Sequence, residues 1–159
     1  MADEQMPNAE DAAAAEGPAI SINAQYTKDL SFEVPNAPMV FGEMQTKQPD
    51  ININIDVSAR QLTEDAFEVE LAITSNCNVG TETGFILELV YAGTFTLNVP
   101  DEHRQPILMI ECPRLLFPFA RNIIAEVTRD GGFPPVMLGT VDFVSMYQQQ
   151  LEAAGQQQA

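Results

Sequence analysis

A strict alternation of apolar and polar side chains in successive segments constrains the fold of this 159-residue chain more than any other feature. Ile or Val occupies every second position between residues 51 and 57, with Asn or Asp between them, and segment 67–73 alternates in the same way. Successive side chains of a β-strand point to opposite faces, so each run predicts a strand with one apolar face. A longer strand is expected from about residue 83 to 98. It carries apolar residues on both faces, because Ile86 and Val90 flank Glu88.

A further strand is expected from Ile20 to Pro35, which lacks the N–H that a strand ladder needs. Toward its end Leu30, Phe32 and Val34 alternate with Asp29, Ser31 and Glu33. From there to Pro49 we expect a loop without regular structure. The loop is unusually apolar, with Met39, Val40, Phe41 and Met44. It is expected either to cover part of the sheet or to bind a ligand.

Segment 111–135, ECPRLLFPFARNIIAEVTRDGGFPP, predicts the main helix. Its apolar residues recur at three- and four-residue steps and so share one face: Leu116, Phe119, Ala120, Ile123 and Val127. Pro113 suits a first helical turn, whereas Pro118 predicts either a bend or a regular part that begins near Phe117. Gly131 and Gly132 are expected to end the helix. A last helix is expected around Phe143, Tyr147 and Leu151, which stand four residues apart.

Strands followed by helices are typical of an α+β fold. We expect a four-stranded, mainly antiparallel sheet with the C-terminal helices packed on one face. Residues 1–18 are expected to form a flexible acidic tail, residues 19–147 one domain, and residues 148–159 a flexible Gln-rich tail. The strands and the long loop offer more apolar surface than two helices can cover, so we expect oligomerisation or a binding surface to take up the surplus.

A formal net charge of −16 argues against nucleic acid or an anionic membrane as the main partner and favours a basic protein surface. Solubility is an equally good explanation of that charge. Cys77 and Cys112 form no CxxC pair, which predicts free thiols rather than a disulfide or a zinc site. The N-terminus has acids where a signal peptide would be basic, and the chain has no long apolar segment. These features predict a cytoplasmic protein that does not insert into membranes.

No motif for enzymatic chemistry stands out. The sequence has no GxxxxGK[ST] loop, no HExxH and no nucleophile elbow. Its one histidine, His103, is flanked by charged residues and is expected to be a solvated surface residue. We therefore expect no enzyme activity, no catalytic residues, no cofactor and no bound metal.

Three long, irregular stretches carry a family resemblance: CPRLLFPFAR, GGFPPVMLGTVDF and YTKDLSFEVPNAP. They resemble the SecB family of bacterial protein-export chaperones, and the similarity extends from about residue 20 to 147. The resemblance implies a homotetramer built as a dimer of dimers. It also implies an ATP-independent chaperone that holds precursor proteins unfolded and delivers them to SecA, the ATPase motor of the Sec export pathway.

The resemblance also implies two sets of site residues. Acidic residues on the outward sheet face of this family meet a basic, zinc-containing tail of SecA, and the matching positions are Asp29, Glu33, Ile86 and Glu88. The candidates for a client groove are Phe41, Met44, Ile51, Ile53 and Ile55. Ordinary sheet core is an equally good reading of each of these isoleucines. The chain has no tryptophan, although some members of the family place one in the long loop.

A different class of function uses the same exposed surface. An acidic oligomeric adaptor would bind one folded partner through it and would need no promiscuous groove. Binding to unfolded but not to native protein distinguishes the chaperone from the adaptor.

Overall fold

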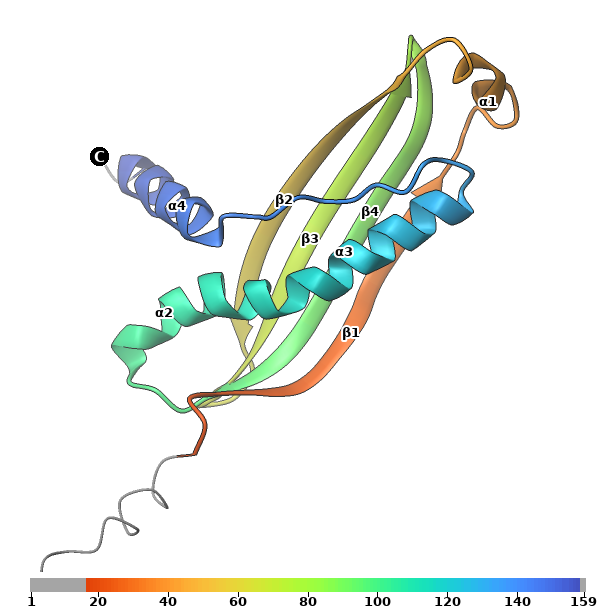
Figure 1. The fold of residues 1–159 in the computed structure, drawn as a ribbon. Helices are drawn as coiled ribbons and strands as arrows, with labels where there is room; N and C mark the ends of the chain where they lie inside the picture. Colours follow the sequence, from red (N-terminus) through yellow and green to blue (C-terminus); the bar gives the residue numbers. More distant parts are fainter. Residues whose placement is uncertain (1–16, 158–159) are drawn as a thin grey trace, which may run out of the picture.

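A computed structural model describes residues 17–157 as one curved sheet with a long helical segment laid across one face (Figure 1). The four strands are β1 (Ile20–Glu33), β2 (Pro49–Gln61), β3 (Ala66–Val79) and β4 (Glu82–Leu97). They lie in the order β1-β4-β3-β2, and every neighbouring pair is antiparallel. The predicted α+β class and antiparallel sheet are confirmed. Short turns join β2, β3 and β4, whereas the chain crosses from one edge of the sheet to the other between β1 and β2.

That crossing contains α1 (Met39–Glu43), so the prediction of a loop without regular structure was wrong. The amide N–H of Val40 donates to the carbonyl of Asn36 at 2.9 Å. The amide N–H of Met44 donates to the carbonyl of Val40 at 3.1 Å. A five-residue helix is unstable in isolation. Here Val40 is almost fully buried in the core, and this tertiary contact stabilises the single turn.

The helical segment also begins earlier than predicted. It starts with a 3₁₀ turn (Asp101–His103), α2 (Arg104–Pro106) and a π-helical turn (Ile107–Glu111), and it continues into α3 (Cys112–Asp130). Pro118 lies inside α3 and does not start it. Gly131 and Gly132 end the helix as predicted, with Gly132 at φ +93°.

The buried face of α3 is rotated from the predicted one. Residues at four-residue steps point into the core: Cys112, Leu116, Ala120, Ile124 and Thr128. Phe119 was assigned to the core face but is half exposed, while Ile123 and Val127 are only partly buried. A second apolar stripe, which includes Leu115 and Phe119, biased the prediction because periodicity alone does not say which stripe meets the sheet.

The core lies between α3 and the faces of β3 and β4 that α3 covers. It holds Val69, Leu71, Ile73, Phe85, Leu87 and Leu89 against Leu116, Ala120 and Ile124. Gly93 of β4 lies opposite Val69 of β3, and the two strands stay in register there. A Cβ at this position would lie 2.9 Å from Cδ2 of Leu116. Glycine is therefore needed for the close approach of α3 to the sheet.

The last helix, α4 (Phe143–Gln157), is confirmed, with Phe143 buried. It follows an extended segment that runs back over the sheet (Figure 1). The helix includes most of the Gln-rich segment that we had assigned to a flexible tail, because Gln, Ala, Leu and Glu are good helix formers. Of the predicted acidic tail, residues 1–16 lie outside the described part of the chain.

Candidate functional site

The sheet has an inner face, which α3 partly covers, and an outer face, which no helix of residues 17–157 covers (Figure 1). On β2 the inner face carries Ile51, Ile53 and Ile55, paired across the ladder with Cys77, Ser75 and Ile73. Their partners on β3 are fully buried, yet Ile51 is 38% exposed and Ile53 44% exposed. Ile51 and Ile53 are therefore not ordinary core within the described chain, whereas Ile55 is partly buried and packs against the core. Ile51 and Ile53 form an open apolar margin along the edge strand.

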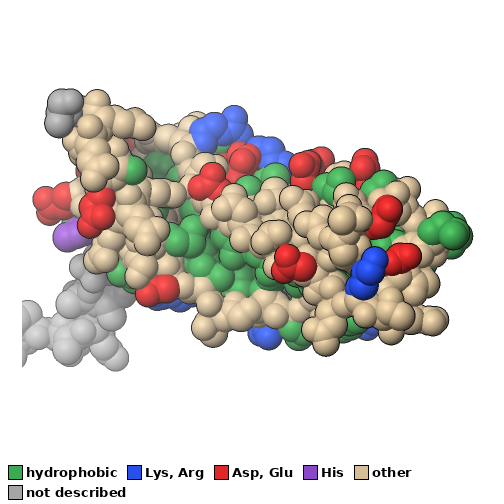
Figure 2. Space-filling model, turned by 90° about the horizontal axis from the view of Figure 1, so that it is seen from above, with side chains coloured by type: hydrophobic (Ala, Val, Ile, Leu, Met, Phe, Trp, Pro, Cys, Tyr) green, Lys and Arg blue, Asp and Glu red, His purple; other side chains and the backbone are tan. Residues whose placement is uncertain are grey.

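Two hollows adjoin this margin. The larger, of about 460 Å³, lies between β2 and α4 and is lined by Ile53, Asn54, Ile55, Asp56, Met146, Gln149, Gln150 and Ala153. The smaller, of about 220 Å³, is lined by Pro49, Ile51, Cys77, Phe85, Phe133 and Pro134. Figure 2 shows hydrophobic side chains in a recess across the middle of the molecule. Ile53 borders the larger hollow and Ile51 the smaller, and the two isoleucines share one face of β2.

The remaining two candidates for the client groove, Phe41 and Met44, pack against the core. The ring of Phe41 packs against that of Phe133, with centroids 5.5 Å apart, and Phe133 meets Phe85 edge-on at 5.0 Å. Met44 packs half-buried against the core. Neither Phe41 nor Met44 lines either hollow directly. Sequence reasoning missed Phe133 and Met146, whose position depends on how the segment after α3 and helix α4 pack on the sheet.

The outer face brings the four acidic-face candidates together. Glu33 on β1 lies directly opposite Ile86 on β4, and Ser31 lies opposite Glu88. Asp29 follows one pair further along, opposite Val90. Asp29, Glu33 and Glu88 are exposed, and Ile86 is 36% exposed. We call Asp29, Glu33, Ile86 and Glu88 the acidic patch. The three carboxylates and one exposed aliphatic side chain lie on the same face, with Glu33 directly opposite Ile86 and Asp29 two rows further along.

A bulge at Lys28 brings Tyr26 and Asp29 to the same face. The pairing shifts by one residue between Thr27, opposite Tyr91, and Asp29, opposite Val90. One extra residue reverses the alternation of a strand. Tyr26 and Asp29 therefore both point outward, although they differ by an odd number of positions.

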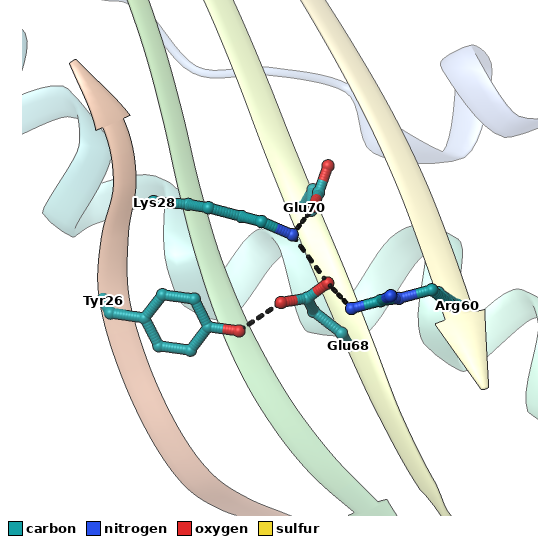
Figure 3. A network of polar contacts seen from close by, with 5 residues as sticks. All are labelled: Tyr26, Lys28, Arg60, Glu68 and Glu70. Carbon is teal, nitrogen blue, oxygen red and sulfur yellow. Dashed lines mark hydrogen bonds and ion pairs between the residues drawn. The ribbon is translucent and has the colours of Figure 1, made fainter. Parts of the chain in front are cut away.

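Next to the acidic patch, five residues form a polar network across the outer face (Figure 3). Nζ of Lys28 lies 3.0 Å from Oε1 of Glu68 and also contacts Glu70. An Nη of Arg60 donates to the same Glu68 oxygen at 2.9 Å, and the hydroxyl of Tyr26 donates to the other. Only 5% of Glu68 is exposed. The hydrogen bond from Tyr26 first, and then those from Lys28 and Arg60, lower the pKa of Glu68 to about 2 despite burial.

The acidic patch borders a third hollow that sequence reasoning missed. It has about 410 Å³ and is lined by Asn52, Thr74, Asn76, Asn78, Thr83, Ile86 and Glu88. The alternation of β2 puts Asn52 and Asn54 on one face, but only the strand register brings them beside the asparagines of β3. We call Asn52, Thr74, Asn76, Asn78 and Thr83 the amide hollow.

The groups that enzymes and metal sites use lie apart. His103 is exposed, as expected, and Cys77 and Cys112 are buried free thiols. Burial raises the pKa of Cys112 to about 12. Residues 17–157 contain no group of three or more His, Cys, Asp or Glu placed to hold a metal ion. None of the helices described here is long and apolar enough to cross a membrane.

Comparison with known families decides the relationship. The family model described as preprotein translocase subunit SecB matches residues 13–154. The chain belongs to the SecB family. Two relatives, each named protein-export protein SecB, come from Rhodopseudomonas palustris and Paramagnetospirillum magneticum. The first is 57% identical and covers 91% of each chain; the second is 54% identical over 82% of this chain and 84% of its own.

A solved SecB-like chaperone of Mycobacterium tuberculosis, in complex with a peptide from an antitoxin, has the same fold. The TM-score is 0.66 over 78% of this chain and 91% of that one, at 14% sequence identity. The predicted SecB relationship is confirmed by the family model and the curated relatives, and the fold is shared with this SecB-like chaperone.

Proposed function

We propose that this protein is an export chaperone that binds unfolded precursor proteins along the inner margin of β2. The observation that carries the proposal is the exposed row of Ile51 and Ile53 beside two hollows, in a chain of the SecB family. Clients that share only unfoldedness must be recognised through apolar side chains rather than through a fixed set of polar contacts. Aliphatic, aromatic and methionine side chains suit such binding.

The outer face is the proposed docking site for SecA. The acidic patch offers three carboxylates and Ile86, which complements a basic segment that carries an apolar residue. Surface charges of this kind hasten encounter and fix orientation, and their effect falls as salt rises. Clients and SecA thus use opposite faces of one sheet. A ternary complex is therefore sterically allowed within one protomer.

The working form is proposed to be a homotetramer, a dimer of dimers. Edge strand β1 exposes Ile22 and Leu30 on the inner face, and α3 exposes Leu115 and Phe119. This second apolar surface lies at the opposite edge of the sheet from β2. Assembly through it leaves the client groove open.

Client capture is proposed to be reversible and nucleotide-independent, in the cytoplasm, before export. Association must then outrun client folding, and release follows when SecA competes for the client. A requirement for ATP hydrolysis by the isolated protein during client release would contradict this mechanism.

Analytical ultracentrifugation tests the proposal directly. The protein alone is expected to sediment as a tetramer. With a slow-folding precursor, and without nucleotide, it is expected to form a complex when the precursor is presented unfolded and none when it is native. Equal binding of the native precursor would favour the acidic adaptor, and a monomer would contradict the proposed assembly.

A further inference from the structure

We propose that the docking face does not end at the acidic patch but continues across β3 and β2 into the amide hollow, which hydrogen-bonds the main chain of the docked segment. The inference rests on the proposed function, in which a basic segment of SecA docks on the outer face. It assigns that segment a direction, from the carboxylates on β1 and β4 toward the asparagines on β3 and β2.

The strand register carries this inference. Glu33 lies opposite Ile86, Ile86 opposite Asn76, and Asn76 opposite Asn52. One row thus crosses all four strands on the same face. The next row contains Ser31, Glu88, Thr74 and Asn54. With strands about 4.8 Å apart, each row spans roughly 14 Å, the length of about four residues of extended peptide.

The chemistry of the hollow differs from that of the rest of the outer face. Asparagine is depleted in strands, yet Asn52, Asn76 and Asn78 stand on two neighbouring strands of this one. All three are exposed, and no side-chain hydrogen bond within residues 17–157 engages their amides. Each amide offers both a donor and an acceptor, as a peptide main chain does. The hollow of about 410 Å³ gives a backbone room to approach them.

The acidic patch and the amide hollow therefore contribute differently to the binding of the segment. Carboxylates attract a basic segment at long range, and salt screens them. Neutral amides act only at contact, so their contribution changes little with ionic strength. Ile86 lies at the junction, where it can cover one aliphatic side chain of the segment.

Calorimetric titration of the full-length chaperone with purified SecA, and with a zinc-loaded synthetic peptide of the SecA tail, tests this division. Asn52→Ala combined with Asn76→Ala is expected to raise the Kd about tenfold while the slope of log Kd against log salt stays that of the wild type. Glu88→Gln is expected to weaken binding and to flatten that slope. Asn98→Ala, at an exposed position directly after β4, is the matched control.

Asn76→Asp separates amide recognition from charge, because it keeps the shape and adds a carboxylate. If the amide N–H donates to a peptide carbonyl, binding weakens because the donor is lost; tighter binding would overturn donation by this amide. Wild-type affinity in the double variant would overturn the inference. Failure of the wild type to bind either probe would instead refute the proposed docking on the outer face. Far-ultraviolet circular dichroism confirms that each variant is folded.

Discussion

The ring of Phe119 on α3 stacks on that of Tyr91 on β4, with centroids 6.1 Å apart and an interplanar angle of 15°, yet half of Phe119 remains exposed. Leu115, one turn earlier, is 41% exposed on the same side of the helix. A large apolar surface left in water is a common mark of a protein interface. Leu115 and Phe119 are the centre of the surface that we propose for contact between protomers.

Phe119→Asp is expected to dissociate the proposed tetramer into smaller species, because it places a charge in the proposed apolar contact. Sedimentation velocity over a range of protein concentrations measures the effect. Gln61→Glu adds a carboxylate at an exposed position of β2 and is expected to leave assembly unchanged. A tetramer that persists in Phe119→Asp at low micromolar concentration would place the interface elsewhere.

Ile53→Ser is expected to weaken the binding of unfolded precursor about five- to tenfold, since it removes an aliphatic side chain from the margin of β2. Leu62→Ser is the matched control, because Leu62 is equally exposed, at 44%, in the turn after β2. Competition binding with a fluorescent unfolded precursor reports both. Equal losses in the two variants would show that general surface hydrophobicity, and not the groove, binds clients.

Glu33→Lys and Glu88→Lys are each expected to abolish SecA docking at physiological salt, because a like charge then faces the basic segment. Client binding on the inner face should be unchanged. Glu64→Lys, in the exposed turn between β2 and β3, controls for the change in net charge. If Glu64→Lys also abolished docking, the net charge of the protein, and not the acidic patch, would determine SecA binding.

Glu68→Gln is expected to lower the free energy of unfolding at neutral pH by about 2 to 3 kcal/mol, since a nearly buried carboxylate binds Tyr26, Lys28 and Arg60. The pKa of Glu68 is lowered from 4.5 to about 2 in the folded protein. The stabilisation is therefore complete above pH 4.5 and is lost as the pH falls toward 2. The wild type and the variant should converge in that window.

Urea unfolding measures the difference in the free energy of unfolding between wild type and Glu68→Gln. The protein concentration is held fixed, because assembly also contributes to stability. Glu70→Gln removes one partner of Lys28 from a more exposed position and is expected to cost less. A constant difference between wild type and Glu68→Gln from pH 7 to pH 2 would contradict the role of its ionised form.

Much of the fold could be predicted from the sequence because strands and helices leave local periods. The alternation at residues 51–57 predicted β2 and the side on which Ile51 and Ile53 lie. The same reasoning put Asp29 and Glu33 on one face, and Ile86 and Glu88 on one face. It failed at α1, whose single turn depends on the burial of Val40, and at the rotation of α3, where two apolar stripes compete.

The sequence by itself therefore determined the strands, the apolar and polar faces near their centres, the helix end at Gly131, and the family. Only the tertiary structure decided that the bulge at Lys28 puts Tyr26 on the same face as Asp29 and that Glu33, Ile86, Asn76 and Asn52 share one row. It also decided which residues of β2 stay exposed. The physical reason is the distance in sequence over which each feature is determined. The periodicity of a strand or helix depends on neighbouring residues, whereas strand register and the burial of a surface depend on contacts between segments far apart in the chain.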